Sequence, residues 1–425
     1  ASGDVTLNCA LNDVSRNVTL HVIKLWEGEG TEVSPYLITS KADMENLAGM
    51  VNDGTDYQGV YFTVTSDIDL ECDASHPWTP IGNNTNSFKG YFDGDGRTIS
   101  NMVITNANGQ YQGLFGCTTN AEISNLTVAG SMTGDDYTAG VVGCMFGGRV
   151  YNCINNVTCS AGNFIAGICG TLKENGILEN CINAADLTAA QPGGICQNCN
   201  DNSQILNCRN DGDITKTGTN EDYGAGGICQ INYGTISNCC NTGSVSGNNY
   251  VGGICGYNYN KIEKCYNLGL VEGNQWVGGI CGYEEYNGYR NCYVEYCVNV
   301  GEVHANYYYG GVVGTMKGRS NSYRAYCTNC INMAPVIGIP DNTNTGGVIG
   351  QFYNSYYTVN NCYYDKQMSL VGDVYATGLL TSEMIADNLF GADNAAWFYS
   401  ENRYPRLNCM KDADASVAAA EPIFL

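Results

Sequence analysis

The stretch Gly252-Gly253-Ile254-Cys255-Gly256 recurs along most of the chain, in full or with one or two changes. Its second glycine falls at nine positions, separated by 27, 27, 27, 33, 26, 26, 32 and 36 residues. Self-similarity at a period of roughly 20–50 residues is the signature of a repeat architecture such as a solenoid. The nine positions are Gly113, Gly140, Gly167, Gly194, Gly227, Gly253, Gly279, Gly311 and Gly347.

A second phrase, Ile-x-Asn-Cys, runs in step with the first. Its last position is held by Met102, Leu126, Cys153, Cys181, Cys208, Cys239, Cys265, Cys297, Cys330 and Cys362. Seven consecutive units carry an asparagine two residues later: Asn155, Asn183, Asn210, Asn241, Asn267, Asn299 and Asn332. Each unit thus holds three short apolar runs between Gly- and Asn-rich turns, too short for ordinary helices. We predict an all-β chain, a right-handed parallel β-helix of about nine or more coils, with three strands per coil and capped ends.

In such a solenoid the cysteines and asparagines form columns. Alternate residues of a strand share a face, so each column cysteine and the asparagine two positions later point the same way. We expect the asparagines to form a hydrogen-bonded ladder between coils. Apolar residues such as Phe115 and Val313 replace cysteine in some units, which indicates buried reduced thiols acting as small hydrophobes. Disulfides such as Cys153–Cys159 or Cys9–Cys72 remain an alternative.

A metal site is a further alternative for the cysteines. The chain holds two Cys-x-x-Cys phrases, at residues 196–199 and 327–330, which lie far apart in sequence. Zinc sites usually draw on two such pairs close together or on a pair with histidines. The chain has 23 cysteines, an odd number, so at least one thiol stays unpaired within the chain.

The charge balance excludes several classes of partner. The 425 residues carry a formal net charge of −23, with a sequence pI near 4.3. Nucleic acids and anionic membrane surfaces both require clusters of basic residues. No run of eighteen apolar residues is present, so we expect no membrane insertion.

The first third of the chain carries more specific phrases, and Trp397 with residues 403–407 looks like a closing segment. The phrases are residues 35–39, a short helical patch at 44–48, and residues 59–62, 67–70, 78–82, 88–96 and 113–116. They resemble the GLUG-motif repeat proteins of bacterial cell surfaces, which are adhesin-like parallel β-helices. The resemblance implies a secreted or cell-surface bacterial protein, often part of a larger one. We divide the chain into a strand-rich N-terminal cap (1–35), the β-helix (36–375) and a C-terminal capping segment and tail (376–425).

Catalytic residues are not evident in the sequence. Parallel β-helices also include polysaccharide lyases and hydrolases, which need paired carboxylates or a calcium-held uronate with a base. The three histidines are far apart in sequence, and no His-Glu-x-x-His motif occurs. We therefore expect a non-enzymatic protein without a cofactor. Weak calcium candidates are Asp67, Asp69, Asp93 and Asp95, although their spacing lacks a full ligand set.

Three successive units near the C-terminal end are enlarged at one corner. From the repeat glycine to the second phrase, the spacing grows from 12–14 residues to 18, 19 and 15 in the units starting at Gly279, Gly311 and Gly347. Insertions in a solenoid form stacked loops on one face, frequently a binding face. These loops are rich in tyrosine and arginine, which are enriched at recognition surfaces.

We expect the following residues to bind a ligand: Tyr283, Tyr286, Tyr289, Arg290, Tyr293, Tyr308, Tyr309, Arg319, Tyr323, Arg324, Tyr326, Tyr353, Tyr356 and Tyr357. The expected function is a binding or adhesion module for a host or dietary glycan or a surface protein. The alternatives are a carbohydrate-active β-helix enzyme and a passive structural stalk.

Overall fold

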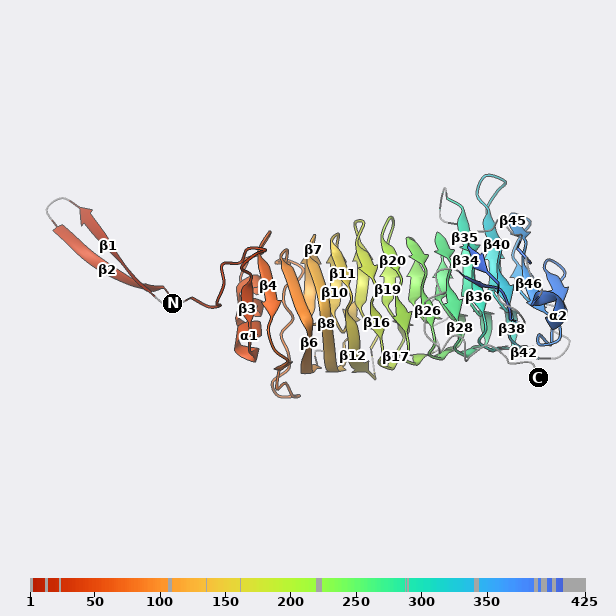
Figure 1. The fold of residues 1–425 in the computed structure, drawn as a ribbon, viewed down its shortest axis with the longest axis horizontal. Helices are drawn as coiled ribbons and strands as arrows, with labels where there is room; N and C mark the ends of the chain where they lie inside the picture. The colour runs from red at the N-terminus through yellow and green to blue at the C-terminus, as the bar shows by residue number, and fades with distance from the viewer. Residues whose placement is uncertain are drawn as a thin grey trace.

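The computed structural model describes residues 3–11, 14–22, 24–105, 109–134, 136–160, 162–218, 224–286, 288, 290–339, 344–385, 389–390, 396–399 and 403–407. It is 50% strand and 4% helix, and its strands form an elongated parallel β-solenoid of about 11 turns (Figure 1). The prediction of an all-β parallel β-helix is confirmed, and its right-handedness stays a prediction. No helix among the described residues is long and apolar enough to cross a bilayer.

One coil shows how the sequence makes a full turn. Residues 255–278 contain five short strands: β29 (Cys255–Asn258), β30 (Lys261–Glu263), β31 (Tyr266–Asn267), β32 (Val271–Glu272) and β33 (Gln275–Gly278). The prediction of three strands per coil is wrong. The segments expected to be turns also pair with their counterparts in the next coil, as Asn241, Asn267 and Asn299 do. We call the five sides that these strands define faces 1 to 5, in chain order.

Each face is a column of parallel strands, one from each coil. Face 1 contains β7 (Phe115–Thr119), β10 (Val142–Phe146), β14 (Cys169–Lys173), β19 (Cys196–Cys199), β24 (Cys229–Asn232), β29, β34 (Cys281–Glu285), β39 (Val313–Lys317) and β44 (Ile349–Phe352). Face 5 contains β9 (Thr138–Ala139), β13 (Phe164–Ala166), β18 (Gln191–Gly193), β23 (Ala225–Gly226), β28 (Asn249–Gly252), β33, β38 (Tyr307–Gly310) and β43 (Thr345–Gly346).

Faces 2 to 4 form one continuous sheet, because long early strands cross several of them. Face 2 contains β3 (Tyr36–Ile38), β4 (Tyr61–Val64), β6 (Tyr91–Ile104), β8 (Glu122–Met132), β11 (Arg149–Tyr151), β15 (Ile177–Glu179), β20 (Gln204–Leu206), β25 (Thr235–Ser237), β30, β35 (Cys292–Glu295), β40 (Ala325–Thr328) and β45 (Tyr357–Asn360).

Face 3 adds β5 (Ile68–Asp69), β12 (Ile154–Cys159), β16 (Ile182–Asn183), β21 (Arg209–Asn210), β26 (Cys240–Asn241), β31, β36 (Val298–Asn299), β41 (Ile331–Asn332), β46 (Tyr363–Asp365) and β47 (Thr377–Leu379). Face 4 adds β17 (Leu187–Ala189), β22 (Ile214–Lys216), β27 (Val245–Ser246), β32, β37 (Val303–Ala305) and β42 (Val336–Gly338).

The asparagine ladder predicted from the sequence is present in the core. The seven asparagines are fully buried, and the side-chain amide of each of the first six donates to the side-chain oxygen of the next, at 2.7–2.9 Å. The same amide nitrogen also donates to the backbone carbonyl two residues further on, as Asn241 does to Gly243 at 2.8 Å. These bonds satisfy polar groups that would otherwise be costly to bury.

The ladder explains why the repeat motif contains a glycine. A Cβ atom on Gly253 would lie 2.1 Å from the carbonyl oxygen of Gly279 and 2.3 Å from Cγ of Asn267. Both distances are far below van der Waals contact. A glycine is therefore required where the asparagine and the next coil approach the backbone.

The cysteines are mainly core residues. The structure describes 21 cysteines outside any disulfide, all buried except Cys72, which is half-buried. Neither Cys153 nor Cys159 forms the disulfide that the sequence left open, and the side chain of Cys9 lies outside the described residues. Their columns support the interpretation as small buried hydrophobes.

The two ends of the solenoid are covered differently. Helix α1 (Lys41–Asn52) buries Met44, Leu47, Ala48 and Val51 against the first coil. The hairpin β1 (Gly3–Leu11) and β2 (Val14–Val22) lies beyond that coil in Figure 1. Near the other end are α2 (Thr381–Met384), β48 (Trp397–Phe398) and β49 (Arg406–Leu407). The domain boundaries at residues 35 and 376 stay a prediction.

Candidate functional site

The corner between faces 1 and 2 widens toward the C-terminal end. It contains the described residues of three successive loops, namely 286, 288 and 290–291, then 318–324, then 353–356. The strands that flank the loops pair in register. On face 1, β34 pairs with β39 and β39 with β44, and on face 2, β35 pairs with β40 and β40 with β45. The loops are therefore neighbours in space, and two of them rise above the body beside β35 and β40 in Figure 1. We call this surface the enlarged corner.

Tyrosines of two preceding coils continue the enlarged corner. The rings of Tyr233 and Tyr259 stack with centroids 4.6 Å apart and an interplanar angle of 1°. The ring centroid of Tyr257 lies 4.7 Å from that of Tyr259 and 4.9 Å from that of Tyr283. The sequence analysis missed Tyr233, Tyr257 and Tyr259, because it searched the units of unusual length, and these three lie in units of normal length.

A hydrogen-bonded chain joins these tyrosines to the loops. The Tyr257 hydroxyl donates to Glu285 at 2.7 Å, and Glu285 forms an ion pair with Lys317 at 2.6 Å. The Lys317 ammonium lies 4.9 Å from the ring centroid of Tyr353, whose side chain is 66% exposed. Burial, followed by the hydrogen bond to Glu285, raises the pKa of Tyr257 well above its ordinary value. Tyr257 is therefore a neutral donor at physiological pH.

Two arginines lie on the first and second loops. Arg290 forms an ion pair with Asp201 at 3.3 Å, so the first loop leans back across two coils. The Arg319 guanidinium lies 5.8 Å from the ring centroid of Tyr286 and donates to the carbonyl of Gly288 at 3.3 Å. Within the described part of the chain, Arg319 forms no ion pair. It is therefore an exposed cation available to an anion, on a chain with a net charge of −23.

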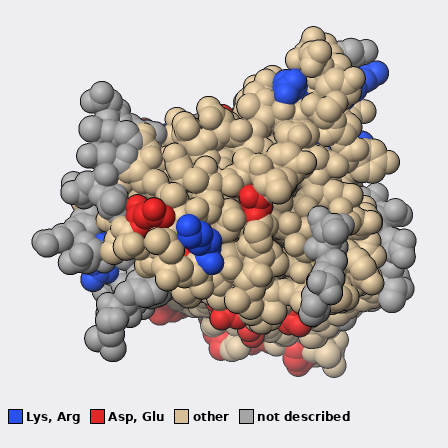
Figure 2. Space-filling view, turned by 90° about the vertical axis from the view of Figure 1, so that its right-hand side faces the viewer, with Lys and Arg blue, Asp and Glu red and all other residues tan. Residues whose placement is uncertain are grey.

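The distribution of charged side chains over the C-terminal end of the molecule agrees with a concentration of basic residues at the enlarged corner. In the end-on view of Figure 2, Lys and Arg occur on the projecting upper part, which corresponds to the loops that rise in Figure 1, and also near the middle and the left of the view. Asp and Glu gather mainly along the lower edge of the same view. The enlarged corner is thus locally basic on an acidic protein.

An open groove of about 510 Å³ runs beside the enlarged corner. It is lined by Lys173, Glu174, Asn200, Asp201 and Tyr233. Because Arg290 binds Asp201, the first loop borders this groove. The volume falls within the range of roughly 300–1,000 Å³ that small-molecule sites occupy.

The structure divides the fourteen residues that the sequence predicted as ligand-binding. Those on or beside the enlarged corner are Tyr286, Arg290, Tyr293, Arg319, Tyr323, Arg324, Tyr326, Tyr353, Tyr356 and Tyr357. Tyr289 lies outside the described residues. Tyr283 lies on β34 and is only 6% exposed, beneath Tyr257. Tyr308 and Tyr309 lie on β38 of face 5 and not at this corner.

Three of these residues have structural roles that the sequence did not show. Tyr309 is 1% exposed and belongs to the core, so its prediction as a ligand contact is wrong. Tyr357 pairs in register with buried Ala325 and stacks on Phe352 at 3.7 Å, near the end of the core. Arg324 donates to the carbonyl of Tyr357 and to the hydroxyl of Thr358, so it ties its loop to β45 of the next coil.

A second row of aromatic side chains lies on face 5. Tyr250, Trp276 and Tyr308 stack in order, with ring centroids 4.5 and 5.8 Å apart. All three have left-handed backbone angles, with φ of 55°, 56° and 55°. Bulky residues rarely adopt this conformation, and such strain frequently marks a functional surface. The ring faces are occupied by neighbouring rings, however, which leaves mainly ring edges for a ligand.

Three of the four predicted calcium candidates, Asp67, Asp69 and Asp93, accept hydrogen bonds from the protein itself. Asp69 accepts from the Glu71 backbone and from Asn101, and these hydrogen bonds, the backbone one first, lower its pKa. Asp67 accepts from the Thr98 backbone at 2.9 Å. Asp93 accepts from the Asp95 backbone and from Asn125, both at 2.9 Å. Calcium binding stays a prediction.

Another pocket, of about 430 Å³, lies at the N-terminal end between α1 and residues 72–79. Its lining includes Lys41, Glu45, Cys72, His76 and Trp78. His76 forms an ion pair with Asp73 at 3.3 Å and is largely exposed. The pocket thus lacks a buried nucleophile or base oriented toward its centre among the described residues.

The sequence was compared with known proteins. No protein-family profile matches it. Over 115 residues it is 38% identical to a "Putative Gly-rich membrane protein" of Evansella cellulosilytica, a match that covers 26% of this chain and 12% of that protein. Over 155 residues it is 27% identical to "Halomucin" of Haloquadratum walsbyi, covering 28% of this chain and 2% of that protein. The matches thus span only a small part of either relative.

Among solved structures, a "putative immunoglobulin A1 protease" from Bacteroides ovatus is 21% identical, with a TM-score of 0.36. The match covers 91% of this chain and 96% of the other. Its name contradicts the prediction that this chain is not an enzyme, although the score is too low to assign protease activity. The GLUG resemblance stays an interpretation, while the parallel β-solenoid that it implied is observed.

Proposed function

We propose that this protein is a cell-surface or secreted binding module whose enlarged corner recognises a glycan that carries negative charge. The observation that carries the proposal is Arg319, an exposed guanidinium without an ion-pair partner in the described chain, held over the Tyr286 ring among stacked loops. Arginine and tyrosine together offer charge-assisted hydrogen bonds and flat apolar area to a ligand.

The surroundings of Arg319 support a sugar as the ligand. Tyr353 is 66% exposed beside the Lys317 ammonium, which gives a ring and a second cation near the third loop. A sugar ring can pack on such an aromatic face, while its carboxylate or sulfate accepts from Arg319. A location at the cell surface is supported by the relative that is named a membrane protein.

The test is a glycan array that contains sialylated, sulfated, uronic-acid and neutral glycans. We expect the protein to bind a charged subset, and the Arg319→Gln and Tyr353→Ala variants to lose that binding. The matched control is Tyr307→Ala, which removes another exposed tyrosine, 46% exposed, from face 5.

Two results would overturn the proposal. One is equal loss of binding in the control and in the two corner variants, and the other is an array without any bound glycan. A protein ligand at the same corner is then the next candidate, and the variants serve to test it.

A further inference from the structure

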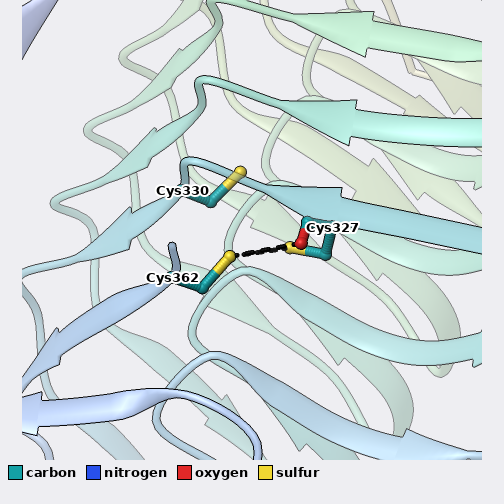
Figure 3. A group of neighbouring side chains, drawn as sticks. All are labelled: Cys327, Cys330 and Cys362. Carbon is teal, nitrogen blue, oxygen red and sulfur yellow. Dashed lines mark hydrogen bonds between the residues drawn. The ribbon is translucent and has the colours of Figure 1, made fainter. Parts of the chain in front are cut away.

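Three cysteines of the last two full coils lie together in the core. Cys327 is on β40, Cys330 follows at the next corner, and Cys362 holds that corner in the following coil. They are 0%, 0% and 3% exposed. Their sulfur atoms all lie within 4.8 Å of one another, and the Cys327 and Cys362 side chains point toward each other in Figure 3.

This cluster is not a by-product of the repeat. Every coil from the one containing Cys181 to the one containing Cys297 also has a corner cysteine. The strand position three residues before that cysteine is aliphatic in those coils, namely Leu178, Ile205, Ile236, Ile262 and Val294. Cys327 pairs in register with Val294 on one side and Val359 on the other. At this strand position only Cys327 adds a second thiol, and no other such trio occurs among the described residues.

The separation of the sulfur atoms suits a shared metal ion. Cys327 and Cys362 are 3.7 Å apart from sulfur to sulfur. Thiolates bound to one zinc ion at about 2.3 Å lie about 3.8 Å apart when the geometry is tetrahedral. A disulfide needs sulfur atoms about 2.05 Å apart, so forming one here requires movement.

We propose that Cys327, Cys330 and Cys362 bind one thiophilic d¹⁰ metal ion, for which Zn²⁺ is the probe. Ligands that are all sulfur select soft cations such as Zn²⁺ and Cu⁺ over Ca²⁺ and Mg²⁺. Binding forms three metal–sulfur bonds and releases the thiol protons to solvent, without any change of oxidation state. The ion ties the Cys327–Cys330 coil to the Cys362 coil and so stabilises the C-terminal coils of the solenoid.

The experiment uses the full chain, reduced with a phosphine and freed of metal with a chelator. Zn²⁺ is titrated in competition with a chromophoric chelator, and backbone hydrogen exchange is measured in β45 and β46. We compare Cys327→Val with the matched control Cys281→Val. Valine occurs at both positions in neighbouring coils, because Val294 is in register with residue 327 and Val313 with residue 281.

The wild type and Cys281→Val should each bind one Zn²⁺, which should slow exchange in both strands. Cys327→Val should bind at least about 100-fold more weakly, since even second-sphere changes cost about 10–100-fold. Equal affinity in Cys327→Val, or no binding by a wild type with all its thiols reduced, would overturn the proposal. If Cys327→Val does not fold, Cys330→Leu replaces it, because Leu126 holds this corner in an early coil.

Discussion

Removing one rung of the asparagine ladder should destabilise the solenoid strongly. Asn241 accepts from Asn210 at 2.7 Å and donates to Asn267 and to the Gly243 carbonyl, both at 2.8 Å. The Asn241→Ala variant therefore leaves one donor and two acceptors without these partners in a fully buried column. Each buried polar group left unsatisfied costs about 1–3 kcal/mol. We expect a loss of about 4 kcal/mol in the free energy of unfolding.

The assay is equilibrium unfolding in urea, followed by circular dichroism and by hydrogen exchange in β21, β26 and β31. Exchange is included because repeat arrays can unfold in parts, and a single transition then hides a local loss. The matched control is Asn306→Ala, an exposed asparagine that donates to Asn274 at 3.1 Å. Water replaces that hydrogen bond, so its loss should cost within about 0.5 kcal/mol. The reasoning is refuted if both variants lose the same small amount.

Three further predictions concern single positions. A Cβ on Gly253 would overlap Gly279 and Asn267, so Gly253→Ala should lower the free energy of unfolding by about 3 kcal/mol in the same urea assay. Gly372 has open space around it, so the control variant Gly372→Ala should change this free energy little. Glu284 is fully buried, and burial raises its pKa well above 4.5. The contribution of Glu284 to stability is full below pH 4.5 and is lost as the pH rises through its folded-state pKa. The Glu284→Gln variant should therefore show a flatter pH dependence of the thermal unfolding temperature than the wild type. Equal pH profiles of the two proteins would contradict this prediction. Among the 21 described cysteines, alkylation of the reduced native protein should label Cys72 first, because the other 20 are buried, and rapid labelling of many of these 20 before unfolding would show that the core is open.

The fold could be predicted because every coil repeats the same short sequence motifs. Gly253, Asn267 and Cys265 each recur in register, and a period near 27 residues fixes the length of a coil. The number of strands could not be predicted, because two-residue strands such as Tyr266–Asn267 have no apolar periodicity of their own and exist only through pairing with the next coil.

The candidate site was only partly predictable. The unit lengths located the three loops, since insertions must leave the repeat at one corner. Counting tyrosines could not separate exposed Tyr353 from buried Tyr309, because the orientation of a side chain depends on strand register within the coil. Tyr233 and Tyr259 could not be found in this way, because the units that contain them have the normal repeat length. Cys327 becomes notable only when strand register places it beside aliphatic residues of the neighbouring coils.

The asparagine ladder also gives the interior of the molecule an electrical direction. Every amide from Asn155 to Asn299 donates toward the following coil and none donates backward along the ladder, so their dipoles add along the axis. Hydrogen bonds in such a row polarise one another, and no single amide can flip without breaking the bonds on both sides. The row starts after the apolar Val128 and stops where Tyr364 takes the place of asparagine. Duplication of a whole coil between these two points preserves the alignment, which makes the whole coil the natural unit by which this protein could lengthen.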